Sequence, residues 1–270
     1  MTVSIVLMPP KQPTSTSTPK TRHEPRQRRW PIEIALFAAM LLVYQGSRAL
    51  VIGDEGKALR NAIEVIDLEK IFGLHFEASI QGWMLENLHV TQVLNQFYIW
   101  AHLPVTALFF VWLYRRRRAA YPFVRNAFFL ANILALAVLV FCPGQPPRMM
   151  TGEGFVDTLS LISGIDLHGG NFSGWFNPYA AVPSMHFAYS LMVGVVIALL
   201  SKNLVLRVAA LMYPALVFVT IVGTANHYVV DAMAGAVVLS AAFAITWFAT
   251  RRAAAYRMRR TDPAVAESQS

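Results

Sequence analysis

Three short segments carry side chains that could act on an anionic substrate. Arg148 ends the run Pro146-Pro147-Arg148, His186 ends Pro183-Ser184-Met185-His186, and His227 precedes Asp231 by four residues. An imidazole acts as a general base or nucleophile near neutral pH, and a guanidinium binds phosphate oxygens in a bidentate geometry. These residue types together indicate chemistry on a phosphate or a similar anion.

The spacing of His227 and Asp231 favours a catalytic pair. Residues four apart on a helix lie on one face, within reach of each other. A carboxylate bound to one imidazole nitrogen fixes the tautomer and leaves the other nitrogen as a base or nucleophile. The same spacing also fits a bond that only stabilises a helix, so this pair alone is open to both interpretations.

The positions of the segments predict that they meet on one side of a membrane. His186 and His227 are 41 residues apart, which corresponds to two crossings of about 20 residues each. Arg148 follows an apolar run that ends on the same side. Each histidine is also expected near the N-terminus of a helix, where free backbone N–H groups and the helix dipole favour a bound anion.

Each segment alone has an ordinary structural explanation. A lone histidine at a helix end is more often structural, and a lone arginine at a membrane boundary usually contacts lipid head groups. Ionisable residues at membrane depth are costly, however, and three such segments on one side favour a functional site.

The composition indicates that a membrane surrounds these segments. Of the 270 residues, 56% are hydrophobic and only 14% are charged, an apolar share above that of soluble domains. The net charge of +8 is concentrated in short blocks between apolar runs, without a basic stripe that alternates with aromatic residues, so we predict no nucleic-acid partner. The single cysteine, Cys142, excludes an internal disulfide.

The predicted fold class is an all-α polytopic membrane protein with six transmembrane helices and additional interfacial amphipathic helices. Of the 23 Lys and Arg, 18 lie in or beside the N-terminal tail, the second and fourth connections and the C-terminal tail. The positive-inside rule then predicts a multi-pass plasma-membrane protein with both termini in the cytoplasm and the site on the non-cytoplasmic side. The expected spans are residues 31–52, 93–114, 123–142, 183–201, 205–225 and 229–250.

The predicted domain organisation follows this topology. Residues 1–30 form a disordered basic tail, residues 31–252 the six-helix membrane domain, and residues 253–270 a cytoplasmic C-terminal tail. Residues 53–92 contain seven acidic residues on a helical apolar pattern, typical of one or two interfacial amphipathic helices, with a soluble cap as the alternative. The 143–182 loop is rich in Gly, Pro and aromatic residues, and we expect it to fold on the membrane surface.

Over roughly residues 90–250, the motifs resemble those of the type 2 phosphatidic acid phosphatase superfamily. Its second motif reads Pro-Ser-Gly-His and its third has a His followed four residues later by Asp, which residues 183–186 and the His227–Asp231 pair match. Met185 in place of the Gly, the run from His227 to Gly235 and the Pro-Pro-Arg-Met run ending at Met149 are most similar to the inositol phosphorylceramide synthase branch.

The sequence departs from the usual superfamily pattern in two places. Phe141 stands where the first motif has a Lys, and Thr220-Ile221 stands where the third has Ser-Arg. Few cations are then left to bind phosphate. Either Arg148 and helix N-termini suffice, or another group enters from the loop, where His168 and Asn171 are candidates.

The resemblance implies a two-step transfer through phosphohistidine. His227 would attack phosphorus, Asp231 would orient it, and His186 would protonate the leaving oxygen and then deprotonate the acceptor. Arg148 and Ser184 would hold the equatorial oxygens. No cofactor is implied. No metal is expected either, because Arg148 and N–H groups meet the charge and no carboxylate cluster is visible in the sequence.

The implied partners are the bilayer and a membrane lipid substrate, and the acceptor of the second step distinguishes the candidate functions. An alcohol acceptor makes an inositolphosphotransferase-like enzyme, whereas water makes a phosphatase acting on phosphatidic acid or a polyprenyl phosphate or pyrophosphate. Acceptor selection is expected in the 143–182 loop and residues 53–92. A non-catalytic lipid-binding protein or a transporter is the remaining alternative, although no paired repeat typical of transporters is present. Protein partners are not identified by the sequence.

Overall fold

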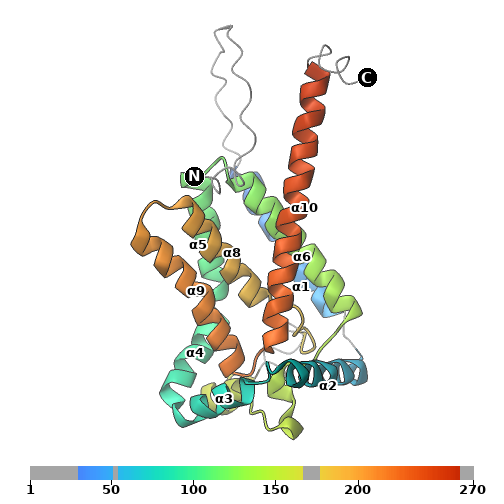
Figure 1. Cartoon of the computed structure of the whole chain (residues 1–270), viewed down its shortest axis with the longest axis vertical. Helices are drawn as coiled ribbons and strands as arrows, with labels where there is room; N and C mark the ends of the chain where they lie inside the picture. Colours follow the sequence, from blue (N-terminus) through green and yellow to red (C-terminus); the bar gives the residue numbers. More distant parts are fainter. Residues whose placement is uncertain (1–29, 51–53, 167–176, 262–270) are drawn as a thin grey trace.

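The computed structural model describes residues 30–50, 54–166 and 177–261, and these are almost entirely helical. The longer helices run along one axis and form a bundle (Figure 1). Within the described ranges the β pairing is limited to an isolated bridge between Gly144 and Ala180. The predicted all-α class is therefore confirmed, and the predictions for residues 1–29 and 262–270 lie outside the described residues.

The predicted spans correspond to helices of unequal length. Within the described chain, α6, α9 and α10 are long and apolar enough to cross a membrane, and α4 with α5 makes a fourth span if the bent pair is counted as one. The apolar part of α1 and the whole of α8 are shorter. The structure thus shows three to four candidate spans and not clearly six. The bounds are α1 (Trp30–Leu50), α4 (Leu88–Trp100), α5 (His102–Arg116), α6 (Tyr121–Phe141), α8 (Met185–Leu200), α9 (Leu204–Gly223) and α10 (Val229–Thr261).

The predicted span 93–114 is not one straight helix. It is divided at Ala101 into α4 and α5, whose axes differ by 51°. Pro104 explains the break, because it has no N–H to donate to the carbonyl of Trp100, and its ring clashes with that carbonyl. Trp100 is the last residue of α4. The bend directs Tyr98 and His102 into one pocket.

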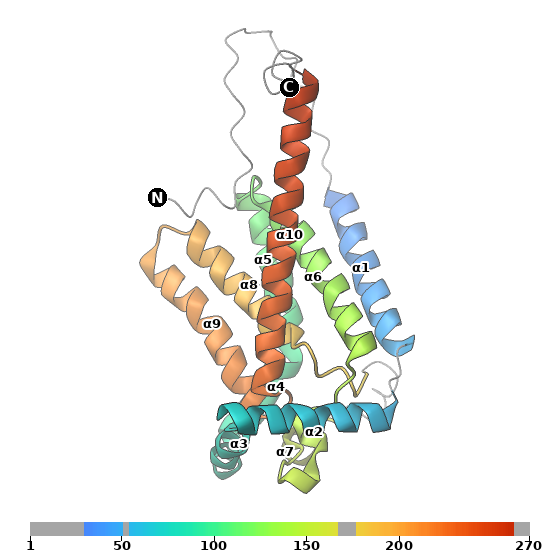
Figure 2. The ribbon, with the colours of Figure 1, turned by 45° about the vertical axis from the view of Figure 1, so that its right-hand side comes forward.

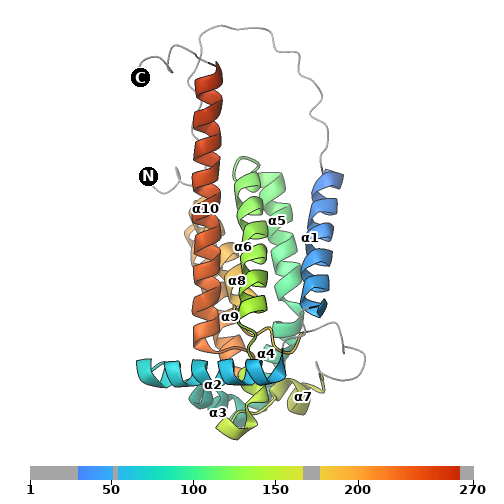
Figure 3. The same cartoon turned by 90° about the vertical axis from the view of Figure 1, so that its right-hand side faces the viewer.

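Short helices cover one end of the bundle. α2 (Glu55–Phe72) runs across the bundle axis, and α3 (Glu77–Glu86) and α7 (Thr158–Ser163) lie beyond it (Figures 2 and 3). α2 is capped by Asp54 and buries Ala58, Ala62, Ile66 and Glu69, which recur every three or four residues. The prediction of helices within residues 53–92 is confirmed, whereas their location at a membrane interface stays a prediction.

The other end of the bundle carries the basic turns. The turn after Arg116 between α5 and α6, the turn after Leu200 between α8 and α9, and the C-terminal end of α10 all lie away from α2 (Figure 3). The acidic α2–α3 segment and the basic turns are therefore at opposite ends, which is the asymmetry that the sequence predicts. The structure also continues α10 to Thr261, beyond the predicted domain boundary at residue 252.

A carboxylate attaches α1 to the bundle. Glu33 of α1 accepts two hydrogen bonds from Arg125 Nη1, at 2.7 and 2.8 Å, and one from the Tyr121 hydroxyl at 2.8 Å. The Arg125 and Glu33 side chains are only 19% and 17% exposed. Because both charges are largely withdrawn from water, each depends on the other for its compensation.

Replacing Arg125 by Ala is expected to loosen α1. Glu33 loses its cation and two charge-assisted hydrogen bonds, and the expected loss is about 1–3 kcal/mol of stability. Thermal unfolding in detergent measures this, with Arg116→Ala as the control because Arg116 is an exposed arginine at the end of α5. Equal melting temperatures for the two variants would contradict this role of the Glu33–Arg125 pair.

Candidate active site

The two histidines meet at the end of the bundle that α2 covers. His186 is the second residue of α8, and His227 lies two residues before the start of α10. The centroids of their rings are 5.9 Å apart. The 41-residue spacing therefore predicted their proximity correctly.

Arg148 is held by the loop that carries His227. It lies in η2 (Pro147–Met149), is 7% exposed, and donates from Nη1 to Asn226 Oδ1 at 2.7 Å. Its backbone N–H donates to the carbonyl of Ala225 at 2.8 Å. Ala225 has φ 55°, a left-handed conformation that is costly for a residue with a Cβ and is often found at functional sites. Arg148 Nε is buried without a hydrogen-bond partner among the described residues, so this guanidinium has donor capacity left for an anion.

The contacts of His227 determine its tautomer. Its Nδ1 lies 3.0 Å from the carbonyl oxygen of Ala181 and 3.3 Å from Asp231 Oδ2. Both neighbours are acceptors, so Nδ1 carries the hydrogen and Nε2 is the basic nitrogen. His227 is 5% exposed and Asp231 is fully buried. This arrangement orients one nitrogen of His227 for proton transfer or nucleophilic attack.

The spacing suggested that His227 and Asp231 pair within one helix, but in the structure they do not. His227 precedes α10, and Asp231 lies in its first turn. The same Asp231 oxygen accepts the backbone N–H of Tyr228 at 3.0 Å, so this carboxylate folds back over the start of the helix as in a capping box. The pair is close because this carboxylate both caps α10 and contacts the imidazole.

The expectation of free N–H groups at the start of α10 is wrong. Val229 N–H donates to Glu77 Oε1 at 3.0 Å, and Val230 N–H donates to Glu69 Oε1 at 2.8 Å. These carboxylates come from α2 and α3, more than 150 residues earlier in the chain. An anion at this site must therefore be bound by other groups.

Ser184 has a structural task in addition to its expected role. Its hydroxyl oxygen accepts the N–H of Phe187 at 3.4 Å and caps α8, while its backbone N–H donates to the carbonyl of Asp231 at 2.9 Å. The second bond joins the start of α8 to the start of α10. Because the hydroxyl accepts in the first bond, its hydrogen is still able to donate to a phosphate oxygen.

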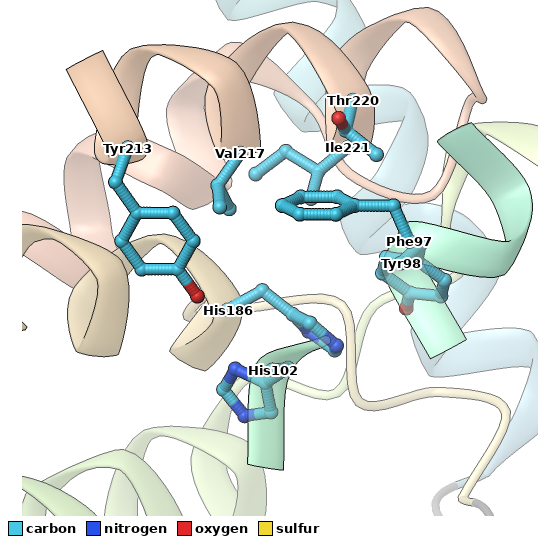
Figure 4. Close-up of a pocket in the computed structure, with 8 residues that line it drawn as sticks. All are labelled: Phe97, Tyr98, His102, His186, Tyr213, Val217, Thr220 and Ile221. Atoms are coloured by element: carbon cyan, nitrogen blue, oxygen red, sulfur yellow. The ribbon is translucent and has the colours of Figure 1, made fainter. Parts of the chain in front are cut away.

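His186 lines a pocket between α4, α5, α8 and α9 (Figure 4). Its ring stacks on Tyr98, with centroids 4.4 Å apart, and lies 4.3 Å from the ring of His102. His102 in turn stacks on Tyr189 at 4.9 Å. Tyr98 and His102 were missed in the sequence, where the only indication of their position is Pro104, which breaks the helix beside them. The lining residues are Phe97, Tyr98, His102, His186, Tyr213, Val217, Thr220 and Ile221.

The structure gathers two carboxylates that are separated in the sequence. Glu69 and Glu77 are both fully buried and lie with His75 in one cluster. Burial raises the pKa of Glu69 to about 9, and the charge of the neighbouring Glu77 adds to the shift. The sequence showed no carboxylate cluster, whereas the structure forms one from residues of α2 and α3. The loop candidates His168 and Asn171 lie outside the described residues.

Comparison with known proteins identifies the family. A family model described as the PAP2 superfamily, the type 2 phosphatidic acid phosphatases, matches residues 63–245, and the chain belongs to this superfamily. The match begins within α2, so the covering helices are part of the family domain. No curated protein and no solved structure matches the chain.

The close contact of α10 with α8 makes Gly235 a sensitive position. A Cβ on Gly235 would lie 2.4 Å from the backbone oxygen of Ser184, so Gly235→Ala must push the two helices apart. We expect a loss of about 1–3 kcal/mol of stability and a fall in phosphate turnover, because His186 and His227 are carried by these helices. Thermal unfolding and labelled-lipid turnover measure the two effects.

Gly82→Ala is the matched control, since its Cβ would meet no atom within 4 Å. If Gly235→Ala were as stable and as active as Gly82→Ala, the contact would not govern the site.

Proposed function

We propose that this protein is a membrane-embedded enzyme that transfers or hydrolyses the phosphate of a lipid through a phosphohistidine intermediate. The observation that carries the proposal is the convergence of the His186 and His227 rings, 5.9 Å apart, with the buried Arg148 bonded to Asn226, the residue before His227. Membership of the PAP2 superfamily supports a lipid phosphatase or phosphotransferase.

In the first step, Nε2 of His227 attacks phosphorus and the bond from phosphorus to the leaving oxygen breaks. His186 gives its proton to that oxygen. In the second step, His186 takes the proton of the acceptor hydroxyl, the acceptor oxygen attacks phosphorus, and the phosphorus–nitrogen bond breaks. Asp231 holds the imidazole of His227 and stabilises its positive charge in the intermediate.

The charge of the transferring phosphoryl group is met by Arg148 and by the start of α8. Arg148 is fixed through Asn226, with its Nε available. Because α10 has its first N–H groups bound to carboxylates, we assign this task to the hydroxyl of Ser184 and the first turn of α8, which begins beside His186. We propose that these groups act without a catalytic metal at the phosphate.

The topology that we propose has six spans, with α1 and α8 completing the set. The site end is separated from the arginine-rich turns by the length of the bundle (Figure 3). Under the positive-inside rule, both termini are cytoplasmic and the site faces the non-cytoplasmic side of the plasma membrane.

Burial of the site favours transfer to an alcohol over transfer to water. His227 is 5% exposed and Arg148 7%, and excluding water from such a site suppresses hydrolysis of a reactive intermediate. This agrees with the inositolphosphotransferase-like branch suggested by the motifs. Release of free phosphate from phosphatidic acid or a polyprenyl phosphate is the alternative outcome of the experiment below.

Phosphate fate tests the proposal. Full-length protein and its His227→Asn variant are given labelled lipid phosphates and phosphoinositides, with and without lipid alcohols. We expect label to move onto the alcohol, and His227→Asn to reduce the rate at least about 10²-fold, since the nucleophile is lost. His89→Asn, an exposed histidine on α4, is the control.

Label found mainly as free phosphate would make the protein a phosphatase. Turnover that does not depend on His227 would contradict the phosphohistidine mechanism. No turnover of any substrate, together with a wild-type physiological phenotype for the variant, would favour a non-catalytic lipid-binding role.

Arg148→Lys tests the phosphate contact separately. Lysine keeps the positive charge but loses the planar fork and the bond to Asn226. We expect kcat/KM to fall by about 10–10²-fold, since losing an oriented donor to a transition-state oxyanion has at least this effect. Steady-state kinetics measures it against Arg116→Lys, and an unchanged kcat/KM would remove Arg148 from the site.

A further inference from the structure

Glu69, His75 and Glu77 form a second cluster of ionisable groups at the end of the bundle that α2 covers. Each offers one ligand atom, and these atoms lie within 4.8 Å of one another. We propose that the three side chains bind a divalent transition-metal cation such as Zn²⁺ or Mn²⁺. This proposal goes beyond the phosphate chemistry and does not depend on it.

The distances fit a cation between the side chains. His75 Nδ1 lies 3.8 Å from Glu69 Oε2 and 3.5 Å from Glu77 Oε2. A charge-assisted hydrogen bond from imidazolium to carboxylate has a length of about 2.7–2.9 Å. Ligands about 2.1 Å from a tetrahedral metal are separated from each other by about 3.4 Å. The observed separations are close to the distance between two ligands of a tetrahedral metal, and they are too long for a charge-assisted hydrogen bond.

The atoms that face one another lack other partners. Glu69 Oε2, His75 Nδ1 and Glu77 Oε2 are buried without a hydrogen bond to any residue that the structure describes. Glu69 and Glu77 are fully buried, and two such carboxylates are strongly destabilising unless their charge is compensated. A divalent cation would compensate both and would also engage the imidazole.

The outer oxygens are already held in place. Glu77 Oε1 and Glu69 Oε1 accept the N–H groups of Val229 and Val230, so each carboxylate is oriented with its second oxygen toward His75. Oriented carboxylates are typical of metal sites, where outer hydrogen bonds fix the ligands. His75 packs edge-on against Phe155, with ring centroids 6.1 Å apart.

The local chain brings the third ligand between the carboxylates. α2 ends at Phe72, and the cap residue Gly73, with a φ of 66°, reverses the chain. His75 follows before α3 begins at Glu77. One imidazole nitrogen with two carboxylate oxygens is a ligand set suited to Zn²⁺ or Mn²⁺, whereas Ca²⁺ and Mg²⁺ favour oxygen alone. The cation would attach α2 and α3 to the first turn of α10, which begins two residues after His227. It would act by fixing the position of His227.

Metal retention tests the proposal. Full-length protein in nanodiscs is loaded with Zn²⁺, passed through a desalting column and measured by mass spectrometry of the metal. We expect about one Zn²⁺ per chain, reduced at least tenfold in His75→Phe and in Glu77→Gln. Zn²⁺ should also raise the melting temperature of the wild type and not that of the variants.

His89→Phe and Glu86→Gln, which change an exposed histidine and an exposed glutamate of the neighbouring segment, should retain the wild-type amount. His75→Phe keeps both carboxylates, which remain bonded to the start of α10. This variant is therefore still informative if Glu77→Gln does not fold. Equal retention by wild type and His75→Phe, or no Zn²⁺ on the wild type, would overturn the metal site and leave a shared proton or an imidazolium as the compensating charge. Metal retention is measured without any phosphate substrate, so failure of the metal site is distinguishable from failure of the proposed phosphate transfer.

Discussion

The first turn of α10 imposes the constraint on which the rest of the structure depends. Its backbone N–H groups have no partners within the helix and lie where water is scarce, so other groups must pair with them. Glu77 and Glu69 of the covering helices accept the N–H groups of Val229 and Val230, and Asp231 accepts that of Tyr228, directly before the helix. This pairing holds α2 and α3 against the bundle and places Asp231 beside His227. The position of the site therefore follows from how one helix begins.

Distances along the sequence predicted part of the arrangement. The 41-residue spacing, interpreted as two crossings, predicted that His186 and His227 lie close together, and the apolar period of residues 53–92 predicted helices there. The break at Ala101 was harder to place, because a proline in an apolar run can kink a helix or begin one. Here Pro104 faces the carbonyl of Trp100, and the resulting bend brings Tyr98 and His102 to His186. The prediction of six spans of similar length was likewise too regular, because α8 has only 16 residues.

Contacts between remote segments left no signal in the sequence. Glu77 and Val229 are 152 residues apart, and Glu69 and Val230 are 161 apart. Acidic residues in an amphipathic helix are normally solvated, so neither residue was distinguishable from its exposed neighbours by pattern. The left-handed conformation of Ala225 could not be predicted from the sequence either, because alanine rarely adopts it and only the surrounding contacts can impose it. These are also the features that orient Arg148 and His227.

The covering helices α2 and α3 and the pocket beside His186 have different roles, and this difference affects how an acceptor is selected. The sequence suggested that acceptor selection resides in the 143–182 loop and residues 53–92. The buried carboxylates of residues 53–92, however, are engaged in holding α10. The pocket beside His186 is formed instead by the bent α4–α5 pair and by α9, and it combines apolar walls with the rings of Tyr98 and His102 (Figure 4). In the mechanism that we propose, an acceptor alcohol must reach His186, because that residue removes its proton. The bent pair is therefore better placed than the covering helices to discriminate one acceptor from another.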